Sequence, residues 1–246
     1  MDIRQYLDST YLKTAQQAGI TEDANREVAL SLVREAIDQQ FKLAMIRPEY
    51  VAEARKVVDD AGSTLAIGTV IGFPEGTMTI AEKLEQARQA IDDGADELDF
   101  VCNYRAFLAG DEDLVRQEIF EGTELGLHHL KVVKWIIEVA AMDLGEVARI
   151  SSLIKSVVVS HFEGHYNEVF VKSSTGFYKT DDGAPNGATV ETVVTMLENA
   201  APLPVKAAGG VRNFDEAAQM IALGVKRIGT SAAKIIADGG ASQNIY

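Results

Sequence analysis

Four charged residues recur at a regular spacing in the second half of the chain. Asp99, Lys134, Lys172 and Lys206 are separated by 35, 38 and 34 residues. This spacing fits one strand, one helix and their loops, so each residue would lie on the next strand of a parallel sheet. A lysine near other cations in a partly desolvated site loses proton affinity, and its neutral amine can attack a carbonyl to form a Schiff base. The pattern therefore predicts amine chemistry on a carbonyl compound.

Small residues follow the last three apolar runs. They occur in "SSTG" (173–176), "AAGGVR" (207–212) and "GTSA" (229–232). Small residues let backbone N–H groups approach an anion, and barrel proteins frequently bind phosphate after strands seven and eight. The net charge of −14 would repel an anion over most of the surface, so such a site must be local. We expect a phosphate that belongs to the substrate, not to a cofactor.

These residues would be positioned by short apolar runs that alternate with longer amphipathic stretches, which is the pattern of βαβ units. Thr79 with Glu82 predicts the start of one helix, and Asn213 with Glu216 predicts another that ends at Gly224. The eight expected strands are "LDSTYL" from Leu7, "FKLAMI" from Phe41, "STLAIGTVIGF" from Ser63, "DELDFVC" from Asp96, "LKVVKWIIE" from Leu130, "EVFVKSS" from Glu168, "LPVKAAGG" from Leu203 and "VKRIGTS" from Val225.

Eight strands in 246 residues, without a linker, favour one closed (β/α)8 TIM barrel over residues 1–246, with a flexible tail at about 237–246. The alternative is an open doubly wound sheet, which the absence of a GxGxxG motif makes less favourable. In a barrel, the carboxyl ends of the strands converge on one mouth. We expect Asp99 and the three lysines at these strand ends, facing that mouth.

The composition limits which classes of binding partner and which cellular compartment are expected. The acidic charge balance argues against nucleic acid and against an anionic membrane surface. A single cysteine, no signal peptide and no membrane-spanning run predict a cytoplasmic protein. His161 and His165 are four residues apart but lack an evident third ligand, so no metal is expected.

Several segments together resemble one known family. "VKSSTGF", "VKAAGGVR", "DELDFVCNYRAFLAGD" and "TVIGFPEG" are similar to segments of the deoxyribose-phosphate aldolases, and the resemblance extends over nearly the whole chain. It implies a (β/α)8 barrel that reversibly cleaves 2-deoxy-D-ribose 5-phosphate into acetaldehyde and D-glyceraldehyde 3-phosphate through a lysine Schiff base. It also implies that neither a metal nor a cofactor is required.

The resemblance implies a role for each matching residue. Lys172 would form the Schiff base, Lys206 would keep it neutral and relay protons, Asp99 would handle protons through a bound water, and Lys134 would tune this network. The terminal Tyr246 either enters the mouth to assist proton transfer or remains a frayed end. The residues expected to hold the substrate and its phosphate are Ser174, Thr175, Gly176, Gly209, Gly210, Ser231 and Thr10.

The chain departs from the family pattern at a few positions. Ser173 replaces a threonine, Met45 a cysteine and Ala232 a serine, and the segment 138–167 lacks the usual "TGEL" motif and is longer. Two alternatives therefore stay open: an aldolase for another phosphorylated sugar or aldehyde, and a barrel that binds a sugar phosphate without catalysis. A homo-oligomer is compatible with the sequence.

Overall fold

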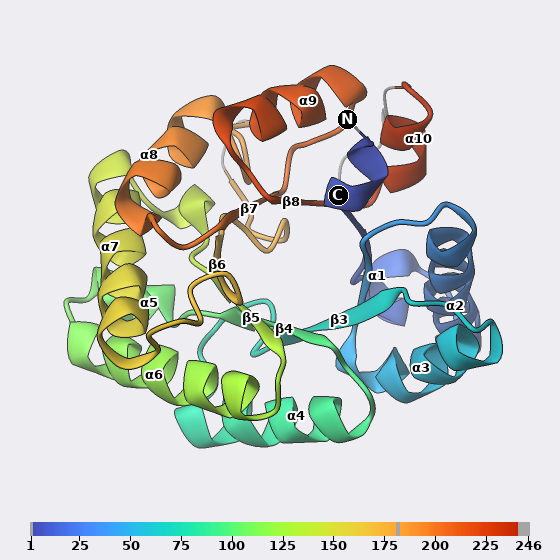
Figure 1. The fold of residues 1–246 in the computed structure, drawn as a ribbon, viewed down its shortest axis with the longest axis horizontal. Helices are drawn as coiled ribbons and strands as arrows, with labels where there is room; N and C mark the ends of the chain where they lie inside the picture. The colour runs from blue at the N-terminus through green and yellow to red at the C-terminus, as the bar shows by residue number, and fades with distance from the viewer. Residues whose placement is uncertain (1, 181–182, 241–246) are drawn as a thin grey trace.

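The computed structural model describes residues 2–180 and 183–240. Eight parallel strands form a closed barrel in sequence order, in which β1 also pairs with β8 (Figure 1). The barrel predicted from the sequence is therefore confirmed, and the open sheet is excluded. The strands are β1 (Leu7–Tyr11), β2 (Leu43–Ile46), β3 (Ala66–Ile71), β4 (Glu97–Val101), β5 (Val132–Ile136), β6 (Val169–Lys172), β7 (Val205–Ala208) and β8 (Arg227–Thr230).

Helices surround the barrel on its outside (Figure 1). The α-helices are α1 (Ala15–Ala18), α2 (Glu22–Asp38), α3 (Val51–Asp60), α4 (Ile80–Asp92), α5 (Tyr104–Leu108), α6 (Glu112–His128), α7 (Leu144–His161), α8 (Val190–Ala200), α9 (Phe214–Leu223) and α10 (Ala233–Ala237). Short 3-10 helices are η1 (Ile3–Tyr6), η2 (Pro48–Tyr50) and η3 (Val139–Ala141). No helix in the described part of the chain is long and apolar enough to cross a bilayer.

The predicted helix caps are present. Thr79 and Glu82 form a reciprocal capping box at the start of α4. The Asn213 side chain accepts a hydrogen bond from the Glu216 N–H at the start of α9, which ends at Gly224 in a left-handed conformation. These contacts satisfy N–H and C=O groups that have no partner within the helix, and they fix where each helix begins and ends.

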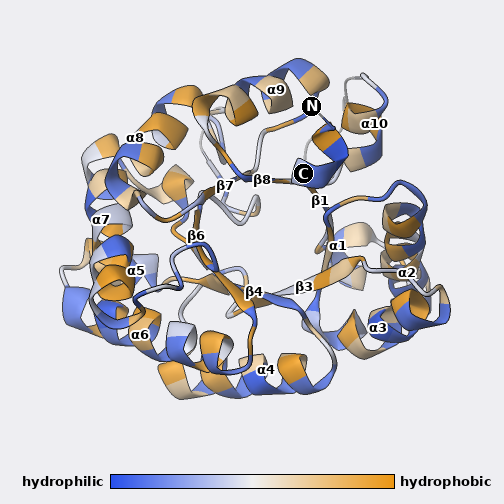
Figure 2. Cartoon of the chain, in the orientation of Figure 1, coloured by the Kyte–Doolittle hydropathy of each residue, from blue (hydrophilic) through white to orange (hydrophobic). Residues whose placement is uncertain are grey.

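The buried apolar residues of the described chain form three separate clusters. The largest cluster lies between the outer face of the barrel and the helices, and Figure 2 shows hydrophobic residues along the strands and on parts of the helix surfaces. A small cluster of Leu12, Leu43, Met45 and Val70 comes from β2, β3 and the residue after β1. A third cluster comes from the ends of β4 and β5 and the start of α5, and it consists of Val101, Tyr104 and Ile136. The charged residues of the barrel strands come from β1 and from β4 to β8, and β2 and β3 contribute none.

The long segment after β5 has its own structure. It consists of η3 and α7, whose first turn is fixed by a capping box between Asp143 and Glu146. Helix α7 packs against α6 and α8. The segment therefore forms mainly a helix of the outer layer, similar in length to α2 and α6. The tail expected at 237–246 stays a prediction, because Ala237 ends α10 and residues 241–246 lie outside the described chain.

Candidate active site

The four residues with regular spacing lie on four consecutive strands, β4 to β7, as predicted. Their expected position at the strand ends is wrong for three of them. Asp99 and Lys134 are the third residues of five-residue strands, and Lys206 is the second residue of β7, whereas Lys172 does end β6. Alternate residues of a barrel strand point inward, so a polar residue can lie inside the barrel without ending the apolar run.

The Asp99 carboxylate forms ion pairs with the ammonium groups of all three lysines. Its Oδ1 lies 2.6 Å from the Lys134 ammonium nitrogen. Its Oδ2 lies 2.9 Å from the nitrogen of Lys172 and 2.9 Å from that of Lys206. The structure thus brings the four predicted residues into direct contact, with Lys172 and Lys206 on the same carboxylate oxygen.

Three further charged residues complete this group. Asp8 Oδ2 lies 2.6 Å from Lys206 Nζ, and Glu97 Oε2 lies 2.5 Å from Lys134 Nζ. Arg227 binds Glu97 through two nitrogens at 3.0 and 3.1 Å, and its Nε donates to Asp8 at 2.8 Å. The interior charge cluster, as it is called below, consists of Asp8, Glu97, Asp99, Lys134, Lys172, Lys206 and Arg227.

Sequence reasoning gave no role to Glu97 and Arg227. A usable signal was present for Glu97, which is two residues before Asp99 and therefore on the same face of β4. Arg227 begins β8 and is 5% exposed. Its burial could not be inferred from "VKRIGTS", because a charge at the start of a strand is ordinarily solvated.

The interior charge cluster has one more basic group than acidic groups. Three carboxylates face three lysines and one arginine, so the cluster is neutral only when one lysine has lost its proton. Burial lowers the pKa of Lys172 to about 8, Asp99 opposes this shift, and Lys206 and Lys134 add to it. Lys172 is therefore the group that can exist as a neutral amine near physiological pH.

Three neighbours in the cluster, Asp8, Asp99 and Lys134, have pKa values shifted toward their charged forms. Burial would raise the pKa of Asp99, but Lys134, Lys172 and Lys206 outweigh it and hold that pKa well below its usual range. Burial would lower the pKa of Lys134, but Asp99 and Glu97 outweigh it and raise that pKa. Arg227 and Lys206 likewise lower the pKa of Asp8 against the effect of burial. Lys172 thus differs from these three neighbours, because its pKa is shifted toward the neutral form.

Glu138 is a functional candidate that sequence reasoning did not single out. It follows β5, has a left-handed backbone conformation with φ 58°, and is 1% exposed. Its carboxyl group lies 2.6 Å from the Ser174 hydroxyl and accepts from the Thr175 N–H at 3.2 Å and from the Thr175 hydroxyl. Ser174 and Thr175, expected at a phosphate, therefore have hydroxyls bound to Glu138.

The glycines expected at a phosphate lie in loops that follow neighbouring strands. Gly176, Gly209 and Gly210 have φ of 79°, 77° and 86°, a conformation that favours glycine. Gly187 packs so closely on Gly209 that a Cβ atom at Gly187 would lie 2.5 Å from the Gly209 backbone. These loops are thereby held together on the β6 and β7 side of the mouth.

Two more residues were expected at the substrate. Ser231 directly follows β8, which pairs with β7, and is exposed. Thr10 lies in β1, is buried, and donates a hydrogen bond to the Asp8 carbonyl at 2.9 Å. Tyr246 lies outside the described residues, so its expected role stays a prediction.

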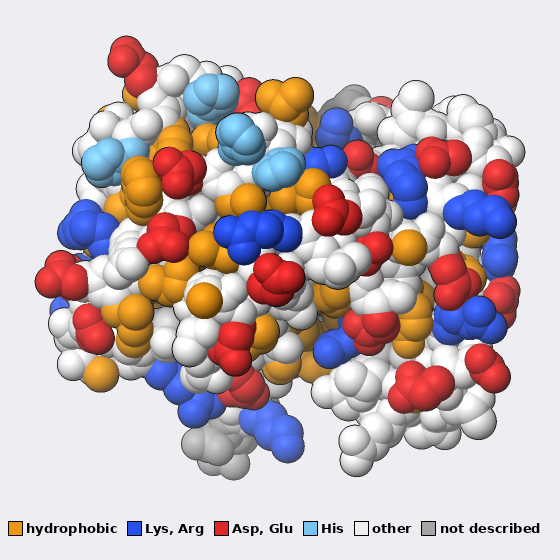
Figure 3. All heavy atoms as spheres, turned by 90° about the horizontal axis from the view of Figure 1, so that it is seen from below, with side chains coloured by type: hydrophobic (Ala, Val, Ile, Leu, Met, Phe, Trp, Pro, Cys, Tyr) orange, Lys and Arg blue, Asp and Glu red, His pale blue; other side chains and the backbone are white. Residues whose placement is uncertain are grey.

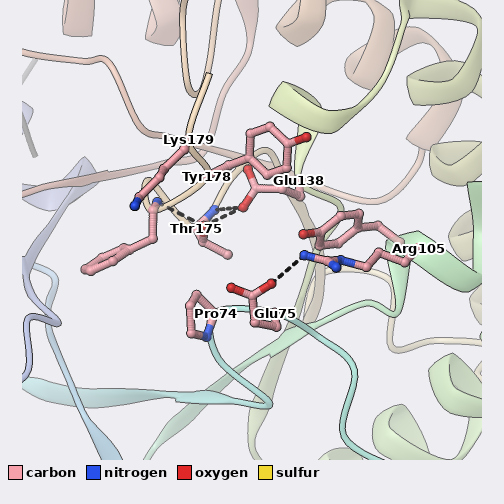
Figure 4. A pocket seen from close by; sticks show the side chains of 9 residues that line it. Pro74, Glu75, Arg105, Glu138, Thr175, Tyr178 and Lys179 are labelled. Carbon is pink, nitrogen blue, oxygen red and sulfur yellow. Dashed lines mark hydrogen bonds and ion pairs between the residues drawn. The ribbon is translucent and has the colours of Figure 1, made fainter. Parts of the chain in front are cut away.

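A cavity of about 400 Å³ opens between the loops after β3, β4, β5 and β6 (Figure 4). Glu138 and Thr175 line it, and an ion pair of 2.7 Å between Arg105 and Glu75 lies at its side. Its lining includes none of the interior charge cluster. The full lining is Pro74, Glu75, Tyr104, Arg105, Glu138, Thr175, Phe177, Tyr178 and Lys179.

The histidines do not form a metal site in the described part of the chain. His128 and His161 end α6 and α7, and Figure 3 shows histidine side chains gathered on one part of the surface. Their rings contact aromatic neighbours, as in the edge-on contact of His161 with Phe120 at 5.1 Å. No group of three His, Cys, Asp or Glu among the described residues could hold a metal ion.

Known proteins are similar to this chain over most of its length. Residues 14–234 match the model of the family described as "DeoC/LacD family aldolase". The deoxyribose-phosphate aldolase of Thermococcus gammatolerans is 35% identical over 97% of this chain and 96% of its own, and that of Lactiplantibacillus plantarum is 36% identical over 96% and 99%. A solved deoxyribose phosphate aldolase from Aeropyrum pernix, described as tetrameric, is 28% identical, covers 96% of this chain and 89% of its own, and has a TM-score of 0.77. The chain therefore belongs to the DeoC/LacD family of aldolases.

Proposed function

We propose that this protein is a class I aldolase that reversibly cleaves 2-deoxy-D-ribose 5-phosphate into D-glyceraldehyde 3-phosphate and acetaldehyde. The observation that carries the proposal is Lys172, a buried lysine with a pKa of about 8 that shares one carboxylate oxygen with Lys206. The relatives with 35% and 36% identity over nearly the full chain are aldolases of this substrate, which supports the same choice here.

In the proposed reaction, the neutral amine of Lys172 attacks the C1 carbonyl of the open-chain sugar, and loss of water gives an iminium ion. The C3 hydroxyl then loses its proton and the C2–C3 bond breaks. The electron pair of that bond moves to the iminium and leaves an enamine, while C3 becomes the aldehyde of glyceraldehyde 3-phosphate. Protonation of the enamine at C2 and hydrolysis of the iminium release acetaldehyde and restore Lys172.

The neighbours of Lys172 are assigned by their contacts and charges. Lys206, 2.9 Å from the oxygen that also binds Lys172, can give and take the protons that the addition and elimination steps require. The low pKa of Asp99 makes it a weak proton acceptor, so we assign it chiefly to orienting both amines and balancing the positive charge of the iminium. Lys134 holds the second oxygen of Asp99 and thereby fixes the orientation of that carboxylate.

For the phosphate we propose the backbone N–H groups of the loops at Gly176, Gly209 and Gly210, with the hydroxyl of Ser231. Ser174 and Thr175 would act by shaping the first of these loops, because their hydroxyls are bound to Glu138. Thr10 would steady β1 beside Asp8. We further propose a homo-oligomer in the cytoplasm, which is supported by the tetrameric relative from A. pernix and by the single cysteine.

Borohydride trapping with acetaldehyde tests the proposal. The expected result is an ethyl group on Lys172, found by peptide mapping, in a protein that cleaves 2-deoxyribose 5-phosphate. Lys172→Ala should lose trapping and lower the cleavage rate by on the order of 10⁴-fold or more, while it still binds the substrate. An adduct on Lys134 or Lys206 would reassign the nucleophile, and an active protein without any adduct would exclude the Schiff base. An unchanged cleavage rate in Lys172→Ala would show that the reaction does not proceed through Lys172.

A further inference from the structure

The hydroxyl of Ser174 lies between two oxygens that both need a proton. Its Oγ is 2.6 Å from Glu138 Oε1 and 2.7 Å from the carbonyl oxygen of Asn186, and it accepts from the Gly176 N–H at 2.9 Å. A hydroxyl has a single proton to donate, and a backbone carbonyl has none. Two short oxygen–oxygen contacts therefore require a second proton, and Glu138 is the group that can carry it.

The second oxygen of Glu138 is already an acceptor. Oε2 accepts from the N–H and from the hydroxyl of Thr175, and the Thr175 oxygen in turn accepts from the Phe177 N–H at 3.0 Å. With a proton on Oε1, Glu138 donates to Ser174, Ser174 donates to Asn186, and each of these polar groups has a partner. An ionised Glu138 would leave two oxygen acceptors in contact without a proton between them.

The surroundings of Glu138 favour the neutral acid. Glu138 is 1% exposed, and among residues 2–180 and 183–240 it forms no ion pair with a lysine, arginine or histidine. Burial raises its pKa, and the hydrogen bonds from Ser174 and Thr175 and the charge of Lys172 oppose this without reversing it. The other titratable groups on the cavity side are Glu75, Tyr104, Arg105, Tyr178 and Lys179.

A second buried glutamate provides the contrast. Glu118 is 3% exposed, and burial also raises its pKa, so the direction of the shift does not separate the two residues. Their partners do. Glu118 contacts the ammonium of Lys83 directly and accepts from the Asn103 N–H at 2.9 Å, so every proton in that group is supplied by a neighbour. Among the described residues Glu138 has no such cation partner, so its own carboxyl group must carry the missing proton.

We propose that Glu138 is a neutral carboxylic acid in the active protein and that its proton holds the substrate-phosphate loops together. From Ser174 the hydrogen bonds lead to Asn186, and the next residue, Gly187, packs on Gly209. The loops after β5, β6 and β7 are thus tied through one proton. Glu138 is in this respect a positioning residue, and the inference rests on the proposed function for its link to a phosphate.

A neutral acid also suits an anionic substrate. Gly176, proposed at the phosphate, follows Thr175 directly, so Glu138 bonds to the same loop. A carboxylate there would repel a phosphate dianion, and the interaction is poorly screened inside a protein. Protonation lets the side chain shape the loop without adding a negative charge to it.

The test compares Glu138→Gln with Glu138→Ala. A glutamine amide can donate to Ser174 and accept from Thr175, so it mimics the neutral acid. We expect Glu138→Gln to keep the KM for 2-deoxyribose 5-phosphate within about threefold and Glu138→Ala to raise it by about tenfold or more, since a buried partner is lost. In the wild-type protein KM should rise as increasing pH ionises Glu138, and in Glu138→Gln this rise should be absent.

Infrared spectroscopy gives a readout that does not depend on catalysis. The carbonyl stretch of a protonated carboxyl should be present in the wild-type protein near neutral pH and missing from Glu138→Gln. Glu118→Gln is the matched control, and it should leave this band unchanged while lowering stability, because its partner is a lysine. Absence of the band, or a Glu138→Gln protein as impaired in KM as Glu138→Ala, would overturn the proposal. Failure of borohydride trapping on Lys172 would instead refute the proposed Schiff-base aldolase. The infrared result would still decide whether Glu138 is protonated.

Discussion

Two groups of buried ion pairs in residues 2–180 and 183–240 differ in their charge balance. Lys83 of α4 and Glu118 of α6 form an ion pair outside the barrel, and the other two Lys83 protons go to the carbonyls of Gly76 at 2.8 Å and Val101 at 2.6 Å. In the interior charge cluster, by contrast, four basic groups share three carboxylates. Both groups are buried, yet only the second contains a surplus charge.

The difference explains why one lysine can react and the other is structural. Lys83 has a carboxylate of its own and two carbonyl acceptors, so all three of its protons are bound. Within the part of the chain that the structure describes, Lys172 pairs with a single carboxylate oxygen, which it shares with Lys206, and loss of its proton brings the cluster to neutrality. A surplus positive charge in a low dielectric is unfavourable, and loss of one proton removes it.

Breaking the ion pair between Lys83 and Glu118 should give the largest effect, a loss of stability. Lys83→Met leaves Glu118 buried without its cation, and we expect a loss of about 3–5 kcal/mol in the free energy of unfolding. Denaturant unfolding monitored by circular dichroism measures this. The double variant Lys83→Met, Glu118→Leu should recover much of the loss, because both charges are then absent. Equal stability of the single variant and the wild type would contradict a structural role for the pair.

The surplus charge should appear in the pH dependence of the reaction. The pKa of Lys172 is lowered to about 8, so the neutral amine is abundant above that pH and scarce below it. We expect kcat/KM to fall as the pH drops below about 8, by about tenfold per pH unit and roughly 100-fold by pH 6. Steady-state rates at constant ionic strength measure this limb. A rate that stays flat from pH 8 to pH 6 would contradict a neutral Lys172 as the nucleophile.

Residues far from the nucleophile should move the same limb in opposite directions. Glu97→Gln removes a negative charge from the interior charge cluster, so the pKa of Lys172 should fall and the limb should move to lower pH. Arg227→Gln removes a positive charge, so the limb should move to higher pH. Each shift should be on the order of one pH unit, or about tenfold in rate at a fixed pH below the limb. Shifts of the same sign would show that charge balance does not set the pKa.

Much of the fold was predictable because its signals are local. The alternation of apolar runs and helices, with caps at Thr79 and Asn213, placed all eight strands in sequence order. The spacing of Asp99, Lys134, Lys172 and Lys206 correctly predicted four adjacent strands. The prediction that all four end their strands failed for Asp99, Lys134 and Lys206, since an apolar run does not reveal which of its residues face the barrel interior.

The eight strands along the chain, the four charged residues with regular spacing and the family resemblance could be read from the sequence alone, because propensity, capping and spacing act over short stretches of chain. Only the tertiary structure decided which charges meet. Arg227 binds Asp8 and Glu97 from 219 and 130 residues away, and Glu138 meets Ser174 and Thr175 across 36 and 37 residues. Charge balance and the location of a proton depend on such contacts, because a pKa is set by burial and by neighbours in space, which the spacing of residues along the chain does not reveal.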